Sequence, residues 1–543
     1  MRQALYQNRS RGQTAQARAV PAPVGGWDTE SPLANMPPQN AVILDNWIPR
    51  AGYVEMRRGF QSHVVGTADE VEAMIAWRGD PSGDKLFACA GANIYDVTTA
   101  GPLGSADYAS ATSARWKYTN FSNDAGAFAI AVNGADTPLK YDGSAFATTA
   151  ITGSSGSITL DPKDLDHVMA HKRRLFFTEK GTLRVWYLSV LAIAGASQLL
   201  DLGPIFDKGG HLVAEGTWSL DGGQGMDDMA VFITSEGQLA VYQGTDPSDA
   251  DNWSLVGVYS VGKPVGDNCL IKWGSDLAVI TQDGVVPLSQ ALNKDRAQQK
   301  QIAITAKIAT GFSEAWSSYG DLFGWSGTTY SGRGSLAIFN IPTTELSEAM
   351  QFVQSIQTGA WCRFTGLNAI CWEVANDQIY FGSVEGVYQW DITASDNGET
   401  IVADVKPAFS NFGSNTEKQF TMIRPLIKAP AIINPALEML TDYRESVPTA
   451  TTTTITPEQL TDSNGIRYDW ASVGGVGYVA TPRMRVSVLG ANDASVIAID
   501  INEVDLLVDD TGGDFILIYP DLPFDIEVRL IGFDVMFIRG GQI

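Results

Sequence analysis

The sequence contains few of the residues on which metal, redox or nucleophilic sites are usually built. Its 543 residues include only four Cys and four His. The cysteines are Cys89, Cys269, Cys362 and Cys371. They form no C-x-x-C pair and three lie in apolar runs, so we expect buried reduced thiols rather than a zinc site. His167 and His171 are four residues apart, but residues 167–177 read as one strand, so the two imidazoles would share no helical face.

Long hydrophobic runs and positive charge are also scarce. The longest apolar stretch, residues 188–200, is too short to span a bilayer, and the first 20 residues lack the apolar core of a signal peptide. We therefore expect synthesis in a cytoplasm and no membrane span. Lys and Arg number 37 against 61 Asp and Glu, a net charge of −24. A chain this acidic does not wrap nucleic acid over its general surface.

No complete catalytic motif is present. Residues 257–263 (GVYSVGK) resemble a phosphate-binding loop, but Pro264 replaces the required Ser or Thr, so we interpret them as a chance match. G-x-S-x-G and H-E-x-x-H are absent. Propeller glycosidases use two facing carboxylates, yet nothing marks such a pair among the 61 acids. We expect a protein that is not an enzyme and that holds no cofactor, and the sequence marks no metal-binding residues.

Turn-forming residues are abundant, and they recur with a period. The chain has 54 Gly and 24 Pro, which favours short strands over long helices. One pattern repeats along it: an apolar strand, a polar turn, and a second strand that ends in an aromatic or apolar pair. The seven repeats are marked, at a mean spacing of about 49 residues, by Asp96, Asp142, Tyr187, Tyr242, Leu288, Phe339 and Asp391.

Strand repeats of this length are typical of the blades of a β-propeller, in which stacked sheets bury one another's faces. We therefore predict an all-β fold with a propeller of about seven blades; two β-sandwiches in tandem are the alternative. The repeats place six Trp in strands, where we expect them to fill the core between blades. They are Trp77, Trp186, Trp273, Trp361, Trp372 and Trp390.

The repeats divide the chain into three expected parts. Residues 1–50 form a basic, Pro-rich arm, residues 51–395 the propeller, and residues 396–543 an antiparallel domain resembling a β-sandwich. A Thr-rich segment at 446–465 reads as an exposed loop or an extended hairpin within the third part.

The first 27 residues contain four arginines and no acid. They are Arg2, Arg9, Arg11 and Arg18. The segment is either a disordered tail, a basic arm that docks on an acidic neighbouring subunit or adaptor, or a transit peptide.

The opposite charge gathers near the other end. Ten acids and no Lys or Arg lie between Arg485 and Arg529. We single out six of them as a candidate surface that repels DNA: Asp500, Glu503, Asp505, Asp509, Asp510 and Asp514. A solvated acidic face and a calcium site are the other interpretations, although no EF-hand loop is present.

Two segments resemble a known family. Residues 21–60 (PAPVGGWDTESPLANMPPQNAVILDNWIPRAGYVEMRRGF) and residues 199–292 are similar to tail proteins of short-tailed bacteriophages, in the tail nozzle (tail tubular protein B) and packaged-DNA-stabilisation class. The resemblance covers about a quarter of the chain well.

The resemblance implies a structural protein of the virion, assembled in the bacterial cytoplasm. Such proteins form a hexameric ring below the portal–adaptor complex, with a propeller outside and β domains around a channel. The ring retains packaged double-stranded DNA and conducts it during ejection without sequence-specific binding, and tail fibres are possible further partners. The alternatives are a propeller that binds or hydrolyses host surface polysaccharide, and a cellular propeller scaffold.

Overall fold

The structure is a computed structural model, and its chain forms two compact units. The described residues are 15–81, 83–221, 226–292, 294–412, 418–429, 434–441, 459–462, 465–479, 482–489 and 528–539. One unit spans Arg58–Gly398; the other combines Met1–Arg57 with Glu399–Ile543. The segment expected as a separate arm therefore belongs, in its described part, to the same unit as the C-terminal strands.

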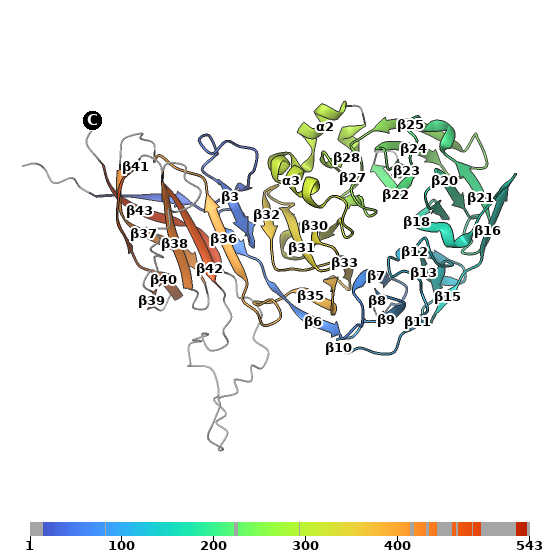
Figure 1. Ribbon diagram of the computed structural model, residues 1–543, viewed down its shortest axis with the longest axis horizontal. Coiled ribbons are helices and arrows are strands. Elements are labelled where there is room, and N and C mark those ends of the chain that lie inside the picture. Colours follow the sequence, from blue (N-terminus) through green and yellow to red (C-terminus); the bar gives the residue numbers. More distant parts are fainter. Residues whose placement is uncertain are drawn as a thin grey trace, which may run out of the picture. The chain divides into compact units, whose positions relative to one another are not determined.

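Seven sheets make up the unit of residues 58–398 (Figure 1). Blade 1 contains β7 (Val71–Trp77), β8 (Lys85–Ala90), β9 (Asn93–Asp96) and β11 (Tyr108–Ala109). Blade 2 contains β12 (Lys117–Asn123), β13 (Gly126–Val132), β14 (Leu139–Tyr141) and β15 (Phe146–Thr148). Blade 3 contains β18 (Leu165–His171), β19 (Arg174–Glu179), β20 (Arg184–Tyr187) and β21 (Gly195–Asp201), extended by β16 (Ile151–Ser155) and β17 (Ile158–Thr159).

The remaining blades follow the same plan. Blade 4 contains β22 (Leu212–Asp221), β23 (Met226–Thr234), β24 (Gln238–Gly244) and β25 (Trp253–Ser260). Blade 5 contains β26 (Leu270–Trp273), β27 (Asp276–Thr281) and β28 (Gly284–Pro287). Blade 6 contains β29 (Ser326–Tyr330), β30 (Leu336–Thr344), β31 (Glu348–Ser355) and β32 (Trp361–Phe364). Blade 7 contains β33 (Cys371–Ala375), β34 (Gln378–Ser383), β35 (Gly386–Thr393) and β6 (Gly59–Val65), with β10 (Gly101–Pro102) beside β6.

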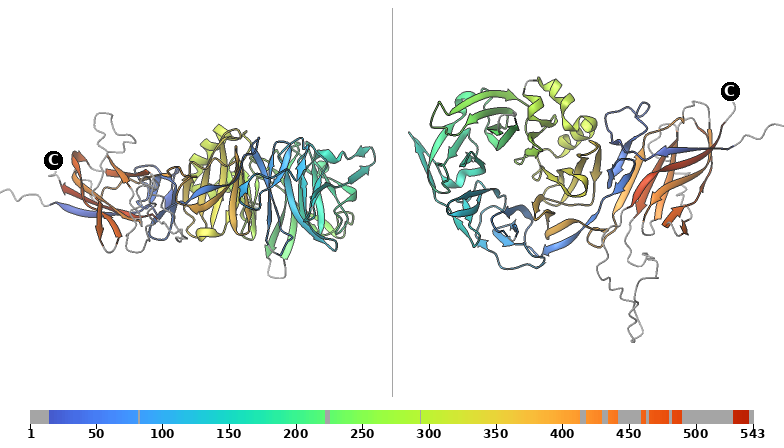
Figure 2. Two further views of the ribbon diagram at one scale, coloured as in Figure 1. Left: turned by 90° about the horizontal axis from the view of Figure 1, so that it is seen from below. Right: turned by 180° about the vertical axis from the view of Figure 1, so that it is seen from behind.

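The seven first strands close into a ring. Each of β7, β12, β18, β22, β26 and β29 contacts the next in that order, β29 contacts β33, and β33 returns to β7. The edge-on view in Figure 2 shows the blades as successive sheets of one disc. The predicted propeller and its seven repeats are thus confirmed, and each of the seven sequence markers lies in or directly after a strand of a different blade.

The last blade joins the two ends of the propeller. β6, which precedes blade 1 in sequence, pairs antiparallel with β35, which comes last. Asn397 N–H donates to the Phe60 carbonyl (2.7 Å), so the segments that lead into and out of the unit lie side by side. The propeller is therefore inserted into the rest of the chain. Its first strand, β6, closes the ring by pairing with its last strand, β35.

Tight turns explain where the strands break. Lys172 and Arg173 both have positive φ (44° and 64°) between β18 and β19, whose ends His171 and Arg174 are paired. Two central residues with positive φ are typical of a type I′ hairpin turn. The single strand expected over residues 167–177 is therefore wrong: it is a hairpin, because the turn falls inside a run of basic residues that carries no Gly or Asn signal.

The hydrophobic core lies between neighbouring blades. One cluster joins blades 1 and 2 through Trp77, Phe87 and Tyr141, and another joins blades 2 and 3 through Phe128 and Trp186. Of the six Trp predicted to lie between blades, four are buried, namely Trp77, Trp186, Trp361 and Trp390, and Trp273 and Trp372 are half-buried.

A helical segment between blades 5 and 6 was not predicted. It contains α1 (Leu288–Ala291), α2 (Arg296–Ile302) and α3 (Ala309–Tyr319), with the 3-10 turn η3 (Ile304–Ile308). The other 3-10 turns are η1 (Pro162–Asp164), η2 (Gly203–Ile205) and η4 (Gly332–Gly334). No helix within the described ranges combines the length and apolarity needed to cross a membrane.

The second unit contains two mainly antiparallel sheets, as the expected sandwich-like domain requires. The first orders β4 (Trp47–Pro49), β5 (Val54–Met56), β43 (Arg529–Arg539), β37 (Lys418–Lys428) and β41 (Ala471–Val479), and β1 (Gln16–Pro21) pairs with β43. The second orders β3 (Asn40–Asp45), β36 (Val402–Pro407), β42 (Pro482–Leu489) and β38 (Asn434–Thr441), with β2 (Gly26–Trp27) beside β3. A separate hairpin joins β39 (Gln459–Asp462) to β40 (Gly465–Tyr468). The residues of this second unit come from both sides of the propeller insertion.

Candidate functional site

A cavity of about 360 Å³ lies among the first strands of the propeller. Six of the seven first strands line it, all but β22. A propeller brings these strands together at its axis, so side chains far apart in sequence meet there. Charged and polar side chains on the wall include Glu72, Lys117, His167 and Glu373.

Lys117 is the cation of the wall. Its Nζ lies 3.4 Å from the Asp267 carboxylate and donates to His167 Nδ1 at 3.3 Å. The His167 Nε2–H group donates to the Asp267 carbonyl (3.0 Å), which leaves Nδ1 as the acceptor. Burial lowers the pKa of Lys117, and Asp267 opposes that shift. Loops and strands of blades 2, 3 and 5 are thus tied together by one buried ammonium group.

The Glu72 carboxylate, on β7 of blade 1, is held by an arginine that precedes β12 of blade 2. Its Oε2 accepts a hydrogen bond from Arg115 Nε at 2.7 Å. The Arg115 guanidinium also lies over the Phe323 ring, 3.9 Å from its centroid, and 3.6 Å from the Glu345 carboxylate. Stacking and ion pairing together fix the guanidinium plane, so Glu72 has a defined position on the wall.

Glu373 is a carboxyl group on the cavity wall whose pKa is shifted toward neutral pH. Burial raises its pKa to about 7, although hydrogen bonds from Tyr118 and the Val374 backbone partly oppose the rise. Arg78 Nη2 lies 3.7 Å from Glu373 Oε1 and donates to the Val374 carbonyl at 3.0 Å. A carboxyl group with a pKa near 7 exists in both protonation states at neutral pH.

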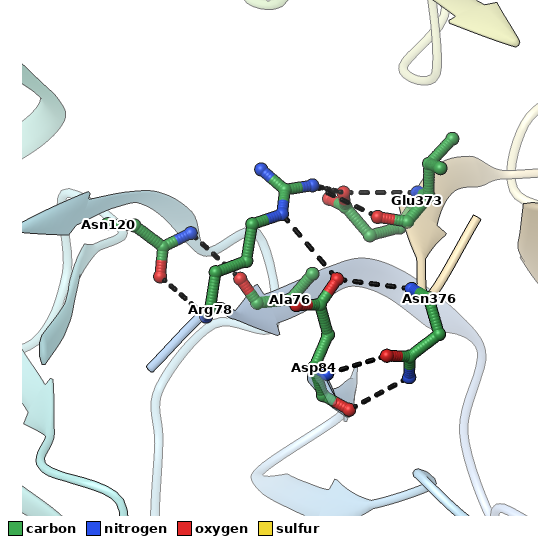
Figure 3. A network of polar contacts seen from close by, with 7 residues as sticks. Ala76, Arg78, Asp84, Asn120, Glu373 and Asn376 are labelled. Atoms are coloured by element: carbon green, nitrogen blue, oxygen red, sulfur yellow. Dashed lines mark hydrogen bonds and ion pairs between the residues drawn. The ribbon is translucent and has the colours of Figure 1, made fainter. Parts of the chain in front are cut away.

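Arg78 also belongs to a polar network at the junction of blades 1 and 7 (Figure 3). Its Nε lies 3.7 Å from the Asp84 carboxylate, and its backbone N–H donates to Asn120 Oδ1. Asn120 Nδ2 in turn donates to the Ala76 carbonyl at 2.9 Å. Asp84 and Asn376 form three further hydrogen bonds across the junction. The network therefore orients Arg78 toward Glu373.

A second buried glutamate lies on β22, the one first strand that does not line the cavity. Burial raises the pKa of Glu215 to about 8, and the nearby Asp166 charge raises it further. Its carboxyl group is consequently protonated for the most part at neutral pH. Two neutral or half-neutral glutamates thus occupy the propeller's first strands.

The chemistry available at the cavity is that of the ionisable groups on its wall. Glu373 can give or take a proton near neutral pH, and Glu72 offers a carboxylate held by Arg115. These are the residue types used for general acid–base work and for hydrogen bonding to polar ligands. The sequence analysis singled out neither residue. A comparison of equivalent positions in the first strands of successive repeats could have found both.

Most residues that the sequence analysis named as site candidates lie outside the described part of the chain. Arg2, Arg9 and Arg11 do, as do Asp500, Glu503, Asp505, Asp509, Asp510 and Asp514. Arg18 is exposed on β1 and lies opposite Val535 of β43. The described part of the basic segment therefore pairs with a strand of its own chain.

The cysteines behave as apolar side chains. Cys89, Cys269 and Cys362 are buried, Cys371 is partly exposed, and all four are free thiols. Burial raises the pKa of Cys269 and of Cys371 to about 12. Among the described residues no group of three or more His, Cys, Asp or Glu side chains is arranged to hold a metal ion.

No protein family and no curated protein matches the sequence. Solved structures show only distant likeness. BBS1N, solved in complex with ARL6DN, is 9% identical over 65% of this chain and 99% of its own, with a TM-score of 0.41. A glycoside hydrolase family 43 arabinoxylan arabinofuranohydrolase from Bacillus subtilis is 8% identical over 92% and 96%, with a TM-score of 0.26. The six-bladed fucose-binding lectin of Aleuria aurantia is 11% identical over 55% and 95%, with a TM-score of 0.28. Similarities this distant carry no argument about function.

Proposed function

We propose that this chain is a structural protein of a phage tail, a nozzle or hub ring below the portal–adaptor complex. The ring would retain the packaged genome and conduct it during ejection. The observation that carries the proposal is the architecture: a propeller inserted into a β unit built from both ends of the chain. The resemblance of residues 21–60 and 199–292 to tail nozzle proteins implies the same two components.

The charge of the chain supports a conduit for DNA. Six copies at −24 each would carry about −144, and duplex DNA carries one negative charge per roughly 1.7 Å of its axis. A channel wall of the same sign as DNA repels it and leaves it free to slide. Gating then depends on the shape of the channel rather than on binding to the genome.

The test is the assembly state of the purified full-length protein, alone and mixed with a portal–adaptor complex. We expect a six-fold ring with an axial hole, seen in particle images and as a mass six times that of the 58.4 kDa chain. A 58.4 kDa monomer that persists with the portal–adaptor complex present would exclude the ring.

A second candidate function is favoured by the axial cavity. Glu373 and Glu72 on its wall are the residue types with which a propeller binds or hydrolyses a glycan. The test is binding and cleavage of host capsule and lipopolysaccharide by the wild-type protein and by Glu373→Gln. Binding or cleavage that the substitution abolishes would support this function. A negative result with the wild-type protein would remove it, whatever the assembly state.

A further inference from the structure

A second, larger cavity lies at blades 4 and 5 and shares no lining residue with the axial cavity. It measures about 540 Å³ and is lined by four segments of the chain. Lys208 precedes β22, Glu236 lies in the turn between β23 and β24, Lys263 follows β25, and residues 294–296 connect α1 to α2. We call it the basic pocket.

Positive charge is concentrated in this pocket. Its wall carries four cations and two acids, a net charge of +2, in a chain whose net charge is −24. The cations are Lys208, Lys263, Lys294 and Arg296, and the acids are Glu236 and Asp295. A local excess of cations inside an acidic protein focuses the potential at one concave place and attracts anions to it.

Two of the cations are available to a ligand. Lys263 Nζ is paired with Glu236 at 2.8 Å, and Arg296 is paired with Asp283. Lys208 Nζ donates to the Ser260 hydroxyl at 3.2 Å, and Lys294 is exposed. Within the described ranges neither of these two lysines is part of an ion pair. Each ammonium group has donors left to offer.

The acid beside these lysines is already engaged. Asp295 is the N-cap of α2, and its carboxylate accepts a hydrogen bond from the Gln298 backbone N–H at 2.9 Å. N-cap bonding of this kind stabilises the first turn of a helix, so Asp295 serves the local fold. Its carboxylate therefore does not cancel the Lys294 charge by direct pairing.

The buried side-chain amide of Gln299 links three segments of the pocket wall. Gln299 is 2% exposed, and its Nε2 donates to the carbonyls of Ser260 (2.9 Å), Ala291 (3.2 Å) and Lys294 (3.1 Å). On the opposite wall, the Lys208 backbone N–H donates to Gln238 Oε1 at 2.8 Å. The backbone that carries Lys208 and Lys294 is thus fixed, which lowers the entropic cost of binding.

We propose that the basic pocket binds a compact anion with clustered phosphate groups, either a free pyrophosphate or a phosphate-bearing glycan. Lysine ammonium groups act as point charges toward phosphate oxygens. The concave shape admits a compact group, and the net charge of −24 on the whole chain disfavours a long polyanion such as duplex DNA. The site is separate from the proposed ring assembly and does not depend on it.

The first experiment titrates sodium pyrophosphate into the full-length protein by isothermal calorimetry. We expect saturable binding that weakens as the salt concentration rises, because the contacts are partly exposed charges. The double variant Lys208→Ala/Lys294→Ala should bind more than about tenfold more weakly, since each lysine donates charged hydrogen bonds. Lys272→Ala, which removes an exposed lysine on β26 outside the pocket, should bind as the wild type does.

Circular dichroism of both variants shows whether they are folded, and the replaced side chains lie at the surface. Absence of pyrophosphate binding by the wild-type protein would overturn the proposal. Equal binding by the wild-type protein and a folded double variant would overturn it as well. The failure of ring assembly would leave these outcomes unchanged, so the two proposals are tested independently.

A second set of titrations identifies the source of the phosphate. Lipopolysaccharide core oligosaccharide is compared before and after phosphatase treatment. Binding that is lost on dephosphorylation and in the double variant assigns the site to a phosphorylated glycan; binding of pyrophosphate alone assigns it to the free anion. If a short DNA duplex binds through the same two lysines more tightly than pyrophosphate, the compact-anion proposal is wrong.

Discussion

Asp84 and Asn376 form three hydrogen bonds with each other across the junction of the first and last blades. Asp84 N–H donates to Asn376 Oδ1 (2.7 Å), Asn376 N–H donates to Asp84 Oδ2 (3.1 Å), and Asn376 Nδ2 donates to the Asp84 carbonyl (3.0 Å) (Figure 3). The two residues are 292 positions apart. They join the turn after β7 to the turn after β33, at the seam where the ring closes.

Replacing Asn376 by Gly should weaken this seam. Asn376 has a φ of 51°, which Gly adopts readily, so the turn is kept while two side-chain hydrogen bonds are lost. We expect the free energy of unfolding to fall by about 1–2 kcal/mol. Urea denaturation followed by tryptophan fluorescence measures the change.

The neighbouring turn residue provides a matched control. Asp377 also has a positive φ (59°) and is exposed, but among the described residues its side chain forms no hydrogen bond across the seam. Asp377→Gly should leave the stability unchanged or raise it slightly by relieving the backbone. An equal loss in both variants would show that the turn, rather than the seam, determines the effect.

Gly59 lies within blade 7, where β6 pairs with β35, and substitution there should also be costly. A Cβ atom there would lie 1.8 Å from the Ser395 carbonyl oxygen, which belongs to the backbone that follows β35. Gly59→Ala must therefore push β6 away from β35, and we expect a loss of more than about 2 kcal/mol in the free energy of unfolding.

Gly104 is the comparison, because a Cβ there meets nothing within 4 Å and its φ is not positive. Gly104→Ala should be neutral or stabilising. Thermal unfolding of both variants by calorimetry decides the point. If Gly59→Ala unfolds at the wild-type temperature, β6 and β35 are not packed as closely as described.

The repeats were predictable from sequence, whereas the seam and the axial cavity were not. Turns and apolar strands recur locally, so the markers Asp96 to Asp391 could be counted along the chain. The contacts of Arg78 with Val374 and of Asp84 with Asn376 span 296 and 292 residues. No local sequence pattern shows which repeat lies beside the first one in the ring. Glu373 differs from most other glutamates only because burial in the folded protein raises its pKa, which the sequence does not show.

The helical segment at 288–319 was missed for a different reason. α2 contains only seven residues, too few to show a clear helical periodicity. Its start signal was nevertheless present: Asp295 is a favoured N-cap residue, and residues 296–302 contain no Gly or Pro. The strand repeat on either side dominated the interpretation of this segment.

The closure by β6 leads to a prediction about the isolated propeller. Residues 58–398 contain every strand assigned above to the seven blades, and the two ends of that range meet through the hydrogen bond between Asn397 and Phe60. We expect this fragment to fold alone and to unfold in one cooperative transition. A fragment that starts at residue 66 lacks β6 and should be destabilised or unfolded, because β35 then has an unpaired edge.

Far-ultraviolet circular dichroism and calorimetry of the two fragments test this directly. Equal stability of the fragments with and without β6 would contradict the closure. If neither folds, the propeller depends on the second unit, and the insertion is not an independent domain.

The two buried glutamates predict how stability depends on pH. A carboxyl group whose pKa is raised on folding holds its proton more tightly in the folded state than in the unfolded state. For Glu215, the free energy of unfolding should therefore fall as the pH rises from 4.5 to about 8, and the loss should be complete above that value. For Glu373 the fall ends at about pH 7.

Glu215→Gln replaces the protonated carboxyl by a neutral group of the same shape and removes this penalty. The variant should match the wild type near pH 4.5 and exceed its free energy of unfolding at pH 9 by on the order of 2–4 kcal/mol. Other groups titrate over the same range, so the informative quantity is the difference between variant and wild type at each pH. Glu314→Gln, at an exposed position of α3, is measured in the same way as a control for the substitution itself. A flat difference for Glu215→Gln would mean that this carboxyl group is ionised in the folded protein, paired with a cation or water that lowers its pKa.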